Sequence, residues 1–326
     1  MPAGLQSASD ESLWLSHDRI PFVAYPHEWP SELLYAAGKL TLSLARDALD
    51  AGLALKDATP YNVVFEGCRP IFVDILSFER RDPLDPSWKP YSQFCHTFLL
   101  PLLLERQNGI PARNWFLLRR EGPTLGDALG LAGPLQRVSP LFASLVTLPA
   151  SLERKARSQG ESLYTGRRTK DVDQAAFIVR SLIGGLEKRL DSVRPSTTLP
   201  SAWLHYGTEP ESYTPAQFAE KEVGVRAMLA QASPEWVLDI GCNTGHFSRM
   251  AAEAGASVVA MDSDGPVVGE TWKQASDLDL RIYSVCGDLA RPTPGLGWLN
   301  RESESLLARF EARFDTGAIQ VMGNWL

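Results

Sequence analysis

The sequence predicts an α/β fold in its C-terminal part and a mainly helical region before it. A short apolar run at 236–240 leads into a turn with two glycines, a helical segment follows, and a second apolar run at 258–261 ends on an acid. Upstream, apolar residues recur at helical spacing along 31–52. With 326 residues, the chain is long enough for two domains and a sizeable core.

The composition argues against several classes of protein. A net charge of −7 argues against a general nucleic-acid binder, which is usually basic. The four cysteines form no CxxC pair, so we expect no zinc site and no disulfide framework, but reduced thiols in a cytoplasmic protein. The N-terminus lacks the basic and apolar regions of a signal peptide. The longest apolar stretch, Phe94–Leu104, contains Pro101 and is too short for a bilayer, so we expect no membrane contact.

The first half of the chain predicts helices joined by short irregular segments. Three prolines prevent a long helix in 19–30, and Ser31 is the expected N-cap of a helix that ends at Gly52. Short apolar runs alternate with Pro and Gly along 110–150, which predicts short packed helices. Arg154–Lys170 is basic and aperiodic, and we expect an exposed linker or loop there, with a clamp for an anionic substrate as the alternative.

These patterns divide the chain into four parts. The boundary before the α/β domain falls at Arg194–Pro200, a Pro/Ser/Thr-rich stretch without periodicity. We expect, in order, a loose N-terminus (1–18), a helical region with a β-hairpin (19–150), a helical linker region (151–200) and the α/β domain (201–326).

The helical region contains a polar constellation of its own. Asp57 and Asn62 are spaced as D-x-x-x-x-N, and a predicted hairpin after them ends at Asp74. That order resembles the catalytic and metal-binding loops of protein and aminoglycoside-type kinases, where the first Asp orients a hydroxyl and the Asn and second Asp hold Mg²⁺. No Gly-rich loop and no strand lysine precede it, and Leu55 stands where kinases have His or Tyr. We therefore expect a degenerate, pseudokinase-like region without a metal, used structurally or for substrate binding.

The glycine-bearing turn has the chemistry of a cofactor site. Gly241 lets the backbone turn sharply off the strand, and Gly245 lets the helix start approach both the sheet and a ligand. Asp262, about 20 residues later, stands where such folds place the carboxylate that binds a ribose diol. Asn243 replaces the glycine that lets a backbone approach a pyrophosphate, which argues against NAD, and Asp239 suits a cationic or amino-acid-like group. The turn resembles motif I of class I S-adenosylmethionine (SAM) methyltransferases.

Two further strands are predicted after Asp262. The first, Leu280–Val285, is followed by Asp288, which resembles the acid that binds the adenine amino group, and by Leu289, whose backbone N–H would lie beside it. The second is expected at Thr316–Met322.

No general base can be named from the sequence. Asn324 follows the fourth predicted strand, where the strand order reverses, and is best placed to contact the methyl acceptor. His205 and Tyr206 are weaker candidates. They precede a helix for which Thr214 is the expected N-cap and Gln217 its capping-box partner.

Several segments resemble, in order, a nodulation-protein-like family of class I SAM methyltransferases with an N-terminal kinase-like part. They are YPHEWPSELL, LKDATPYNVVFEGCRPIFVDILSFE, YSQFCHTFLLPLLL, VLDIGCNTGHFSRMAA and GLGWLNRESESLL. The resemblance implies a Rossmann-like sheet and SAM as the cofactor. It also implies that the residues named in the turn and after the second and third strands are the cofactor contacts. Members of the family often carry a His-His pair where Asn324-Trp325 stand here, so no role for those histidines carries over.

The family's sheet has seven strands, and this sequence predicts four. We therefore expect a sheet truncated after strand 4, in a fragment or a truncated gene product. The edge of strand 4 would be apolar and exposed, so that a partner or self-association would cover it.

The predicted function is methyl transfer from SAM to an unidentified small-molecule or carbohydrate acceptor. The acids that bind ribose and adenine favour this enzyme. The missing strands favour the alternative, a non-catalytic SAM-binding or pseudokinase-like scaffold protein. A third hypothesis, an active kinase, requires Mg²⁺-dependent ATP binding that is lost in Asp74→Ala, and we do not expect it.

Overall fold

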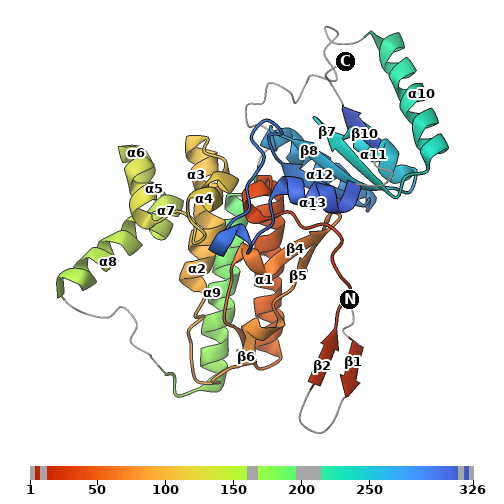
Figure 1. Ribbon diagram of the computed structural model, residues 1–326. Helices are drawn as coiled ribbons and strands as arrows, with labels where there is room; N and C mark the ends of the chain where they lie inside the picture. Colours follow the sequence, from red (N-terminus) through yellow and green to blue (C-terminus); the bar gives the residue numbers. More distant parts are fainter. Residues whose placement is uncertain (1–3, 8–12, 160–167, 196–213, 315–318, 323–326) are drawn as a thin grey trace.

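The apolar runs of the C-terminal part form a four-stranded parallel sheet (Figure 1). The computed structural model describes residues 4–7, 13–159, 168–195, 214–314 and 319–322. The strands are β7 (Trp236–Ile240), β8 (Ser257–Asp262), β9 (Ile282–Cys286) and β10 (Ile319–Met322), and their spatial order is β10-β7-β8-β9. Because β7, β8 and β9 are parallel neighbours, their carboxyl ends meet at one edge, and the strand order reverses between β7 and β10.

Helices cover both faces of this sheet. Its helices are α10 (Pro215–Ala232), α11 (His246–Glu253), α12 (Gly265–Leu278) and α13 (Leu306–Phe314). Side chains alternate along a strand, so Val258 and Ala260 of β8 join the hydrophobic cluster of α10, α11 and α12. Val259 and Met261 join a second cluster that contains α13 and much of the N-terminal region. Both faces of the sheet are therefore buried, as parallel sheets require.

In its described residues, the N-terminal region is mainly helical and carries three small antiparallel strand pairs. Its helices are α1 (Ser31–Asp50), α2 (Tyr91–Phe94), α3 (Leu100–Asn108), α4 (Ala112–Leu118), α5 (Leu125–Leu131), α6 (Pro134–Val138), α7 (Pro140–Phe142), α8 (Leu148–Gln159) and α9 (Val172–Ser192). The strand pairs are β1 (Gly4–Ser7) with β2 (Leu13–Ser16), β3 (Leu53–Leu55) with β6 (Phe78–Arg80), and β4 (Val63–Glu66) with β5 (Arg69–Phe72). In Figure 1, α1 and α9 lie side by side and form the centre of this region. No helix in the described ranges is long and apolar enough to cross a membrane.

Three local predictions need correction. Pro30, not Ser31, is the N-cap of α1, because Ser31 lies inside the helix and its hydroxyl donates to Glu105. The start of the chain was expected to be loose, but β1 and β2 pair there, as the Leu-Trp-Leu run of β2 allows. An exposed linker or loop is the expectation for Arg154–Lys170, but α8 continues through its first part to Gln159.

Two π-helical turns explain how the helices accommodate proline. Cys95–Leu99 forms such a turn directly before Leu100 and Pro101, and Ala143–Thr147 forms one directly before Leu148 and Pro149. A proline inside a helix lacks an N–H and crowds the preceding turn. The wider π turn relieves that crowding, so α2 and α3 form one continuous helix across Pro101.

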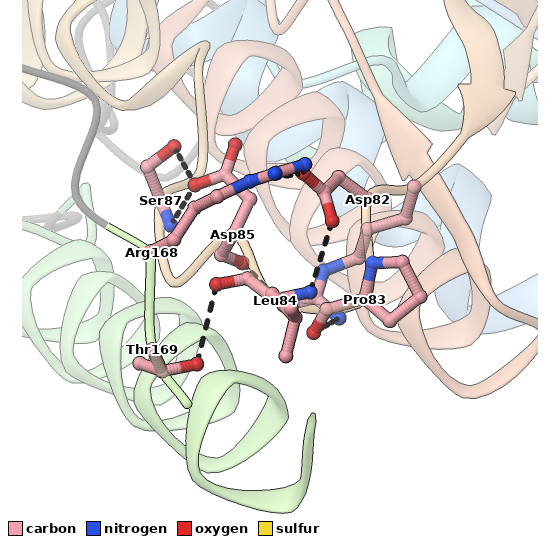
Figure 2. A network of polar contacts seen from close by, with 8 residues as sticks. Asp82, Pro83, Leu84, Asp85, Ser87, Arg168 and Thr169 are labelled. Atoms are coloured by element: carbon pink, nitrogen blue, oxygen red, sulfur yellow. Dashed lines mark hydrogen bonds and ion pairs between the residues drawn. The ribbon is translucent and has the colours of Figure 1, made fainter. Parts of the chain in front are cut away.

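The start of α9 is held against the Pro- and Asp-rich loop after β6 (Figure 2). Arg168 forms an ion pair with Asp82, and the backbone N–H and side-chain hydroxyl of Thr169 both donate to the Leu84 carbonyl, at 3.0 and 3.2 Å. Within the loop, Asp82 accepts from the Leu84 N–H at 3.1 Å. These contacts fix the segment that leads into α9 against the loop after β6.

A buried ion pair fastens α13 to the extended segment before α1. Arg309 pairs with Glu28, and their side chains are 5% and 0% exposed. Arg309 also donates to the Val23 carbonyl at 2.5 Å, and its guanidinium lies 4.8 Å from the Tyr25 ring centre. The second carboxylate oxygen of Glu28 accepts from the Tyr25 N–H at 3.0 Å. Both charged groups are therefore buried and hydrogen-bonded to each other and to the backbone.

Replacing Arg309 with alanine is expected to lower the free energy of unfolding by about 3–5 kcal/mol, because Glu28 would remain buried without its partner. Urea unfolding followed by circular dichroism measures the loss. Arg301→Ala removes an exposed arginine nearby and serves as the control, with an expected change within about 0.5 kcal/mol. Equal losses in the two variants would contradict the role of the buried pair.

Candidate functional site at the carboxyl edge of the sheet

The turn after β7, from Gly241 to Gly245 (the glycine turn), folds back onto the end of β8. The N–H groups of Gly241 and Cys242 both donate to the Met261 carbonyl, at 2.8 and 3.1 Å. Gly241, Asn243 and Gly245 have φ values of 73°, 50° and 78°. Three left-handed residues in five make a sharp turn that glycine adopts without strain, which is the role expected for Gly241 and Gly245.

Gly245 is also required by its packing against α12. A Cβ at this position would lie 2.6 Å from the Thr271 side chain, which is 1% exposed. The Thr271 hydroxyl lies 2.9 Å from the Asn243 carbonyl and 3.0 Å from the Val267 carbonyl, so it has little freedom to move. Gly245 is the N-cap of α11, and no side chain caps that helix start. The turn and the start of α11 therefore present backbone groups, rather than side chains, to the edge of the sheet.

Asp239 is a buried carboxyl group at the end of β7. Asp239 is 1% exposed, and its Oδ2 atom accepts a hydrogen bond from the Ser248 hydroxyl at 2.6 Å. Its Oδ1 atom has no hydrogen-bond partner among the described residues. Burial raises the pKa of Asp239 to about 6, since the charged form is poorly solvated there. A buried acceptor without a partner is costly in a finished fold, and it points to a ligand that supplies the missing donor.

Asp262 joins the glycine turn to the loop after β8. Its Oδ2 atom accepts from the Asn243 N–H at 3.1 Å, and its Oδ1 atom accepts from the Asp264 N–H at 3.0 Å. Burial raises the pKa of this carboxyl group. Each carboxylate oxygen can accept more than one hydrogen bond, so acceptor capacity remains for a ligand diol.

The acid after β9 is more exposed. Asp288 accepts from the Ala290 N–H at 2.9 Å and from Arg291 at 3.0 Å. The hydrogen bond from Ala290 is the main reason why the pKa of Asp288 is lowered. Leu289, beside it, is 45% exposed. The structure thus brings Asp239, the glycine turn and Asp262 together, whereas Asp288 and Leu289 lie on the loop that leaves the end of β9.

Helix α10 borders the glycine turn on its other side. The predicted capping box is confirmed, with Thr214 as N-cap and Gln217 as its partner. The imidazole Nε2 atom of His246, at the start of α11, lies 2.7 Å from a Glu222 carboxylate oxygen of α10, and the Phe218 ring lies 5.0 Å from the imidazole. These contacts hold α10 beside the turn. The candidate acceptor residues Asn324, His205 and Tyr206 lie outside the described residues.

The kinase-like residues are divided between a pocket and a structural network. Asp57 and Asn62 line a pocket of about 600 Å³ in the N-terminal region. Asp74 instead caps a short 3₁₀ helix through the Leu76 N–H at 3.1 Å, and it accepts from the Ser77 hydroxyl, to which Asn62 also donates. In the described part of the chain, no group of three or more His, Cys, Asp or Glu residues is placed to hold a metal.

One residue at this edge was missed by the sequence analysis. Arg113, at the start of α4, donates from Nη2 to the Ser263 carbonyl at 3.2 Å, directly after Asp262. It is 150 positions away in the sequence, and no local pattern marks it. Only the packing of the helical region against the sheet brings it here.

Parallel strands, helices on both faces and a glycine turn where the strand order reverses define an α/β protein, a class in which ligands bind at the carboxyl edge of the sheet. Over 300 residues, the chain is 32% identical to the nodulation protein NoeA of Rhizobium meliloti (strain 1021), a similarity that covers 91% of this chain and 62% of that protein. Over 67 residues, it is 34% identical to a malonyl-[acyl-carrier protein] O-methyltransferase of Hamiltonella defensa subsp. Acyrthosiphon pisum (strain 5AT), covering 20% of this chain and 26% of that protein. The chain spans less than two thirds of the length of either relative. No family model and no solved structure matches. Of the two relatives, the second is a methyltransferase by name, and its similarity covers the shorter part of this chain.

Alanine at Gly245 is expected to be more destabilising than alanine at Gly241. Both substitutions place a Cβ in a left-handed backbone, at a cost of about 1–2 kcal/mol. Only Gly245→Ala also overlaps Thr271, whereas a Cβ at Gly241 meets nothing within 4 Å. The extra overlap should lower the free energy of unfolding by roughly another 1–3 kcal/mol in urea titrations. Equal losses would show that Thr271 is not the constraint.

Proposed function

We propose that this chain is a SAM-dependent methyltransferase whose cofactor lies at the carboxyl edge of β7, β8 and β9. The observation that carries the proposal is the unpartnered Oδ1 atom of Asp239, buried beside a glycine turn. The Oδ1 atom of Asn243, in the same turn, is also buried without a partner among the described residues. SAM fits this donor and acceptor set because its methionine end carries an ammonium group and its ribose carries two hydroxyls.

Each part of the edge has a role in this proposal. Asp239 accepts from the ammonium group, directly or through a water, and the turn from Gly241 to Gly245 surrounds the methionine end. Asp262 accepts from the ribose hydroxyls. Asp288 and the N–H of Leu289 face the adenine. SAM supplies a methyl group already activated by its sulfonium, so the protein's task is to hold both reactants and to exclude water.

The acceptor is proposed to be a small molecule or a carbohydrate that approaches beside β10, where Asn324 follows the strand. β10 lies at the edge of the four-stranded sheet. A partner or a second copy of the chain is proposed to cover this edge. The four cysteines are all free and buried, which supports a reducing, cytoplasmic location.

The degenerate kinase-like region is proposed to be a structural support for the cofactor domain. Its β4–β5 hairpin contacts α12, because the Trp272 indole donates to the Cys68 carbonyl at 3.0 Å. Arg69 of the same hairpin forms an ion pair with Asp279, directly after α12. Asp74 is the residue that would bind Mg²⁺ in an active kinase. Here its carboxylate caps a short 3₁₀ helix instead. These contacts favour a supporting role over phosphoryl transfer.

The full chain is expected to bind SAM and its demethylated product, S-adenosylhomocysteine, in calorimetric titrations. Asp262→Ala should weaken both at least about 10-fold, since it removes a charged acceptor from the ribose hydroxyls. Asp277→Ala, which removes an exposed carboxylate of α12, is the matched control and should leave both affinities unchanged. An absence of heat with the wild-type protein would overturn the proposed function.

Affinity for S-adenosylhomocysteine is expected to fall as the pH drops below about 6. The pKa of Asp239 is raised to about 6, and a bound ammonium group favours the charged carboxylate. Below that pH the proton must leave before binding, which costs up to about tenfold in affinity per pH unit. In the unliganded protein, the free energy of unfolding changes with pH in the opposite direction to the affinity. Ionising this buried carboxyl group costs stability, so about 2 kcal/mol of the free energy of unfolding is lost as the pH rises from 4 to 6.

Titrations between pH 5 and pH 8 test this dependence. Asp239→Asn should bind more weakly at pH 8 and show a flatter pH profile, because the substituted group does not titrate. A variant profile as steep as that of the wild type would assign the pH dependence to another group, such as Asp262, whose pKa is also raised.

A further inference from the structure

An arginine of the helical region reaches the carboxyl edge of the sheet. Arg113 is the second residue of α4, and its Nη2 atom donates to the Ser263 carbonyl at 3.2 Å. Ser263 lies between Asp262 and Asp264, on the loop that joins β8 to α12. The contact therefore places a positive charge beside the residue proposed to bind the ribose.

The guanidinium lies between the start of α12 and the end of β9. A Cβ at Gly265 would be 2.8 Å from Nη1 and 4.0 Å from Cζ of Arg113, and 3.9 Å from the sulfur of Cys286. Any side chain larger than glycine at this position would displace the guanidinium. β8 ends at Asp262 on one side of this position, and Asp288 lies on the loop that leaves β9 on the other. That is the stretch of the edge proposed to bind the adenosine part of the cofactor.

The start of α4 is held in place by Glu105 of α3. Its Oε2 atom accepts from the Ala112 N–H at 3.2 Å and from the Ser31 hydroxyl. Burial raises the pKa of Glu105, and the nearby charge of Arg113 opposes that rise. The backbone that carries Arg113 is therefore positioned by two helices of the N-terminal region, α1 and α3.

Most of the donor capacity of Arg113 is unused. A guanidinium has five N–H donors, and the described residues accept one hydrogen bond from this one. No carboxylate in the described part of the chain forms an ion pair with it, although the side chain is only partly exposed. Arginine in a partly buried position usually satisfies its donors, so this one suits a ligand that offers acceptors.

We propose that Arg113 is a cofactor-binding residue, supplied by the helical region, that donates to the adenosine end of the ligand. The inference rests on the proposed function and adds to it a contact from outside the α/β domain. The ring nitrogens of adenine and the ribose oxygens are acceptors, as a guanidinium requires. The methionine end carries the ammonium group, together with a carboxylate, and its ammonium group is bound at the opposite side of the site, beside Asp239. The two charged residues thus orient the ligand, with the arginine at its adenosine end and the acid at its ammonium group.

The test compares two ligands and four variants of the full chain. S-adenosylhomocysteine contains both ends of the ligand, whereas adenosine contains only the end proposed to meet Arg113. Arg113→Ala removes the guanidinium. Gly265→Ala leaves Arg113 in the sequence but displaces its tip, which is the flexible end of a side chain and can move without a change of backbone. Arg120→Ala is the matched control, because Arg120 lies just beyond the same helix and contacts Glu302 and the Tyr61 ring instead.

Arg113→Ala should weaken the binding of S-adenosylhomocysteine and of adenosine by the same factor, about 10- to 100-fold, as expected for the loss of a charge-assisted hydrogen bond. Gly265→Ala should weaken both ligands in the same way, and Arg120→Ala should change neither. Asp239→Asn should weaken S-adenosylhomocysteine but not adenosine. A general loss of stability would weaken both ligands in every variant, so it would not produce this difference between Arg113→Ala and Asp239→Asn.

The thermal unfolding midpoint of each unliganded variant separates binding from folding. A lower midpoint for Arg113→Ala with unchanged affinity for adenosine would overturn the inference and leave Arg113 as a purely structural contact between the two regions. Unchanged affinity in Gly265→Ala together with a loss in Arg113→Ala would also overturn the proposed geometry. If the wild-type chain bound neither ligand, the proposed function itself would fail, so the two failures are distinguishable.

Discussion

A parallel sheet has two apolar faces, and each must be covered for the sheet to be stable in water. Here α10, α11 and α12 cover one face, and α13 and the N-terminal region cover the other. Val259 and Met261 of the central strand β8 share a core with Trp29 and Leu33, more than two hundred positions earlier. The helical region is thus part of the support of the sheet, and the buried pair of Arg309 and Glu28 fastens the two together.

That support has consequences for the carboxyl edge. The position of α12 determines where Thr271 limits the glycine turn and where Gly265 admits Arg113. α12 is itself held by the β4–β5 hairpin through Trp272 and by α1, so the elements that frame the candidate cofactor site come from both parts of the chain.

Residues of opposite charge lie at different points along the carboxyl edge of the sheet. Asp239 is buried at the end of β7, and the Arg113 guanidinium lies at the loop after β8, beside the start of α12. A ligand with an ammonium group at one end and neutral acceptors at the other has a favoured orientation at such an edge. The kinase-like residues do not contribute to this arrangement, because Asp74 is committed to Ser77 and to the cap of a short helix.

Local chemistry allowed the sequence to predict the four strands, the helix after the glycine turn and the capping box at Thr214. Alternating apolar runs, left-handed turn residues and cap residues act over a few positions, and each leaves a pattern that can be recognised. The positions of Asp239, Gly245 and Asp262 at one edge followed from the strand order alone. The hairpin near the N-terminus, the N-cap at Pro30 and the length of α8 differed, since short elements depend on neighbours as much as on propensity.

Other features were decided only by the tertiary structure. The sequence does not show that one oxygen of Asp239 lacks a partner, that Asp74 caps a helix, or that Arg113 and Arg309 meet groups more than a hundred positions away. The physical reason is the same in each case. Burial and hydrogen-bond satisfaction depend on what surrounds an atom in space, and those surroundings are assembled only when the helical region packs against the sheet.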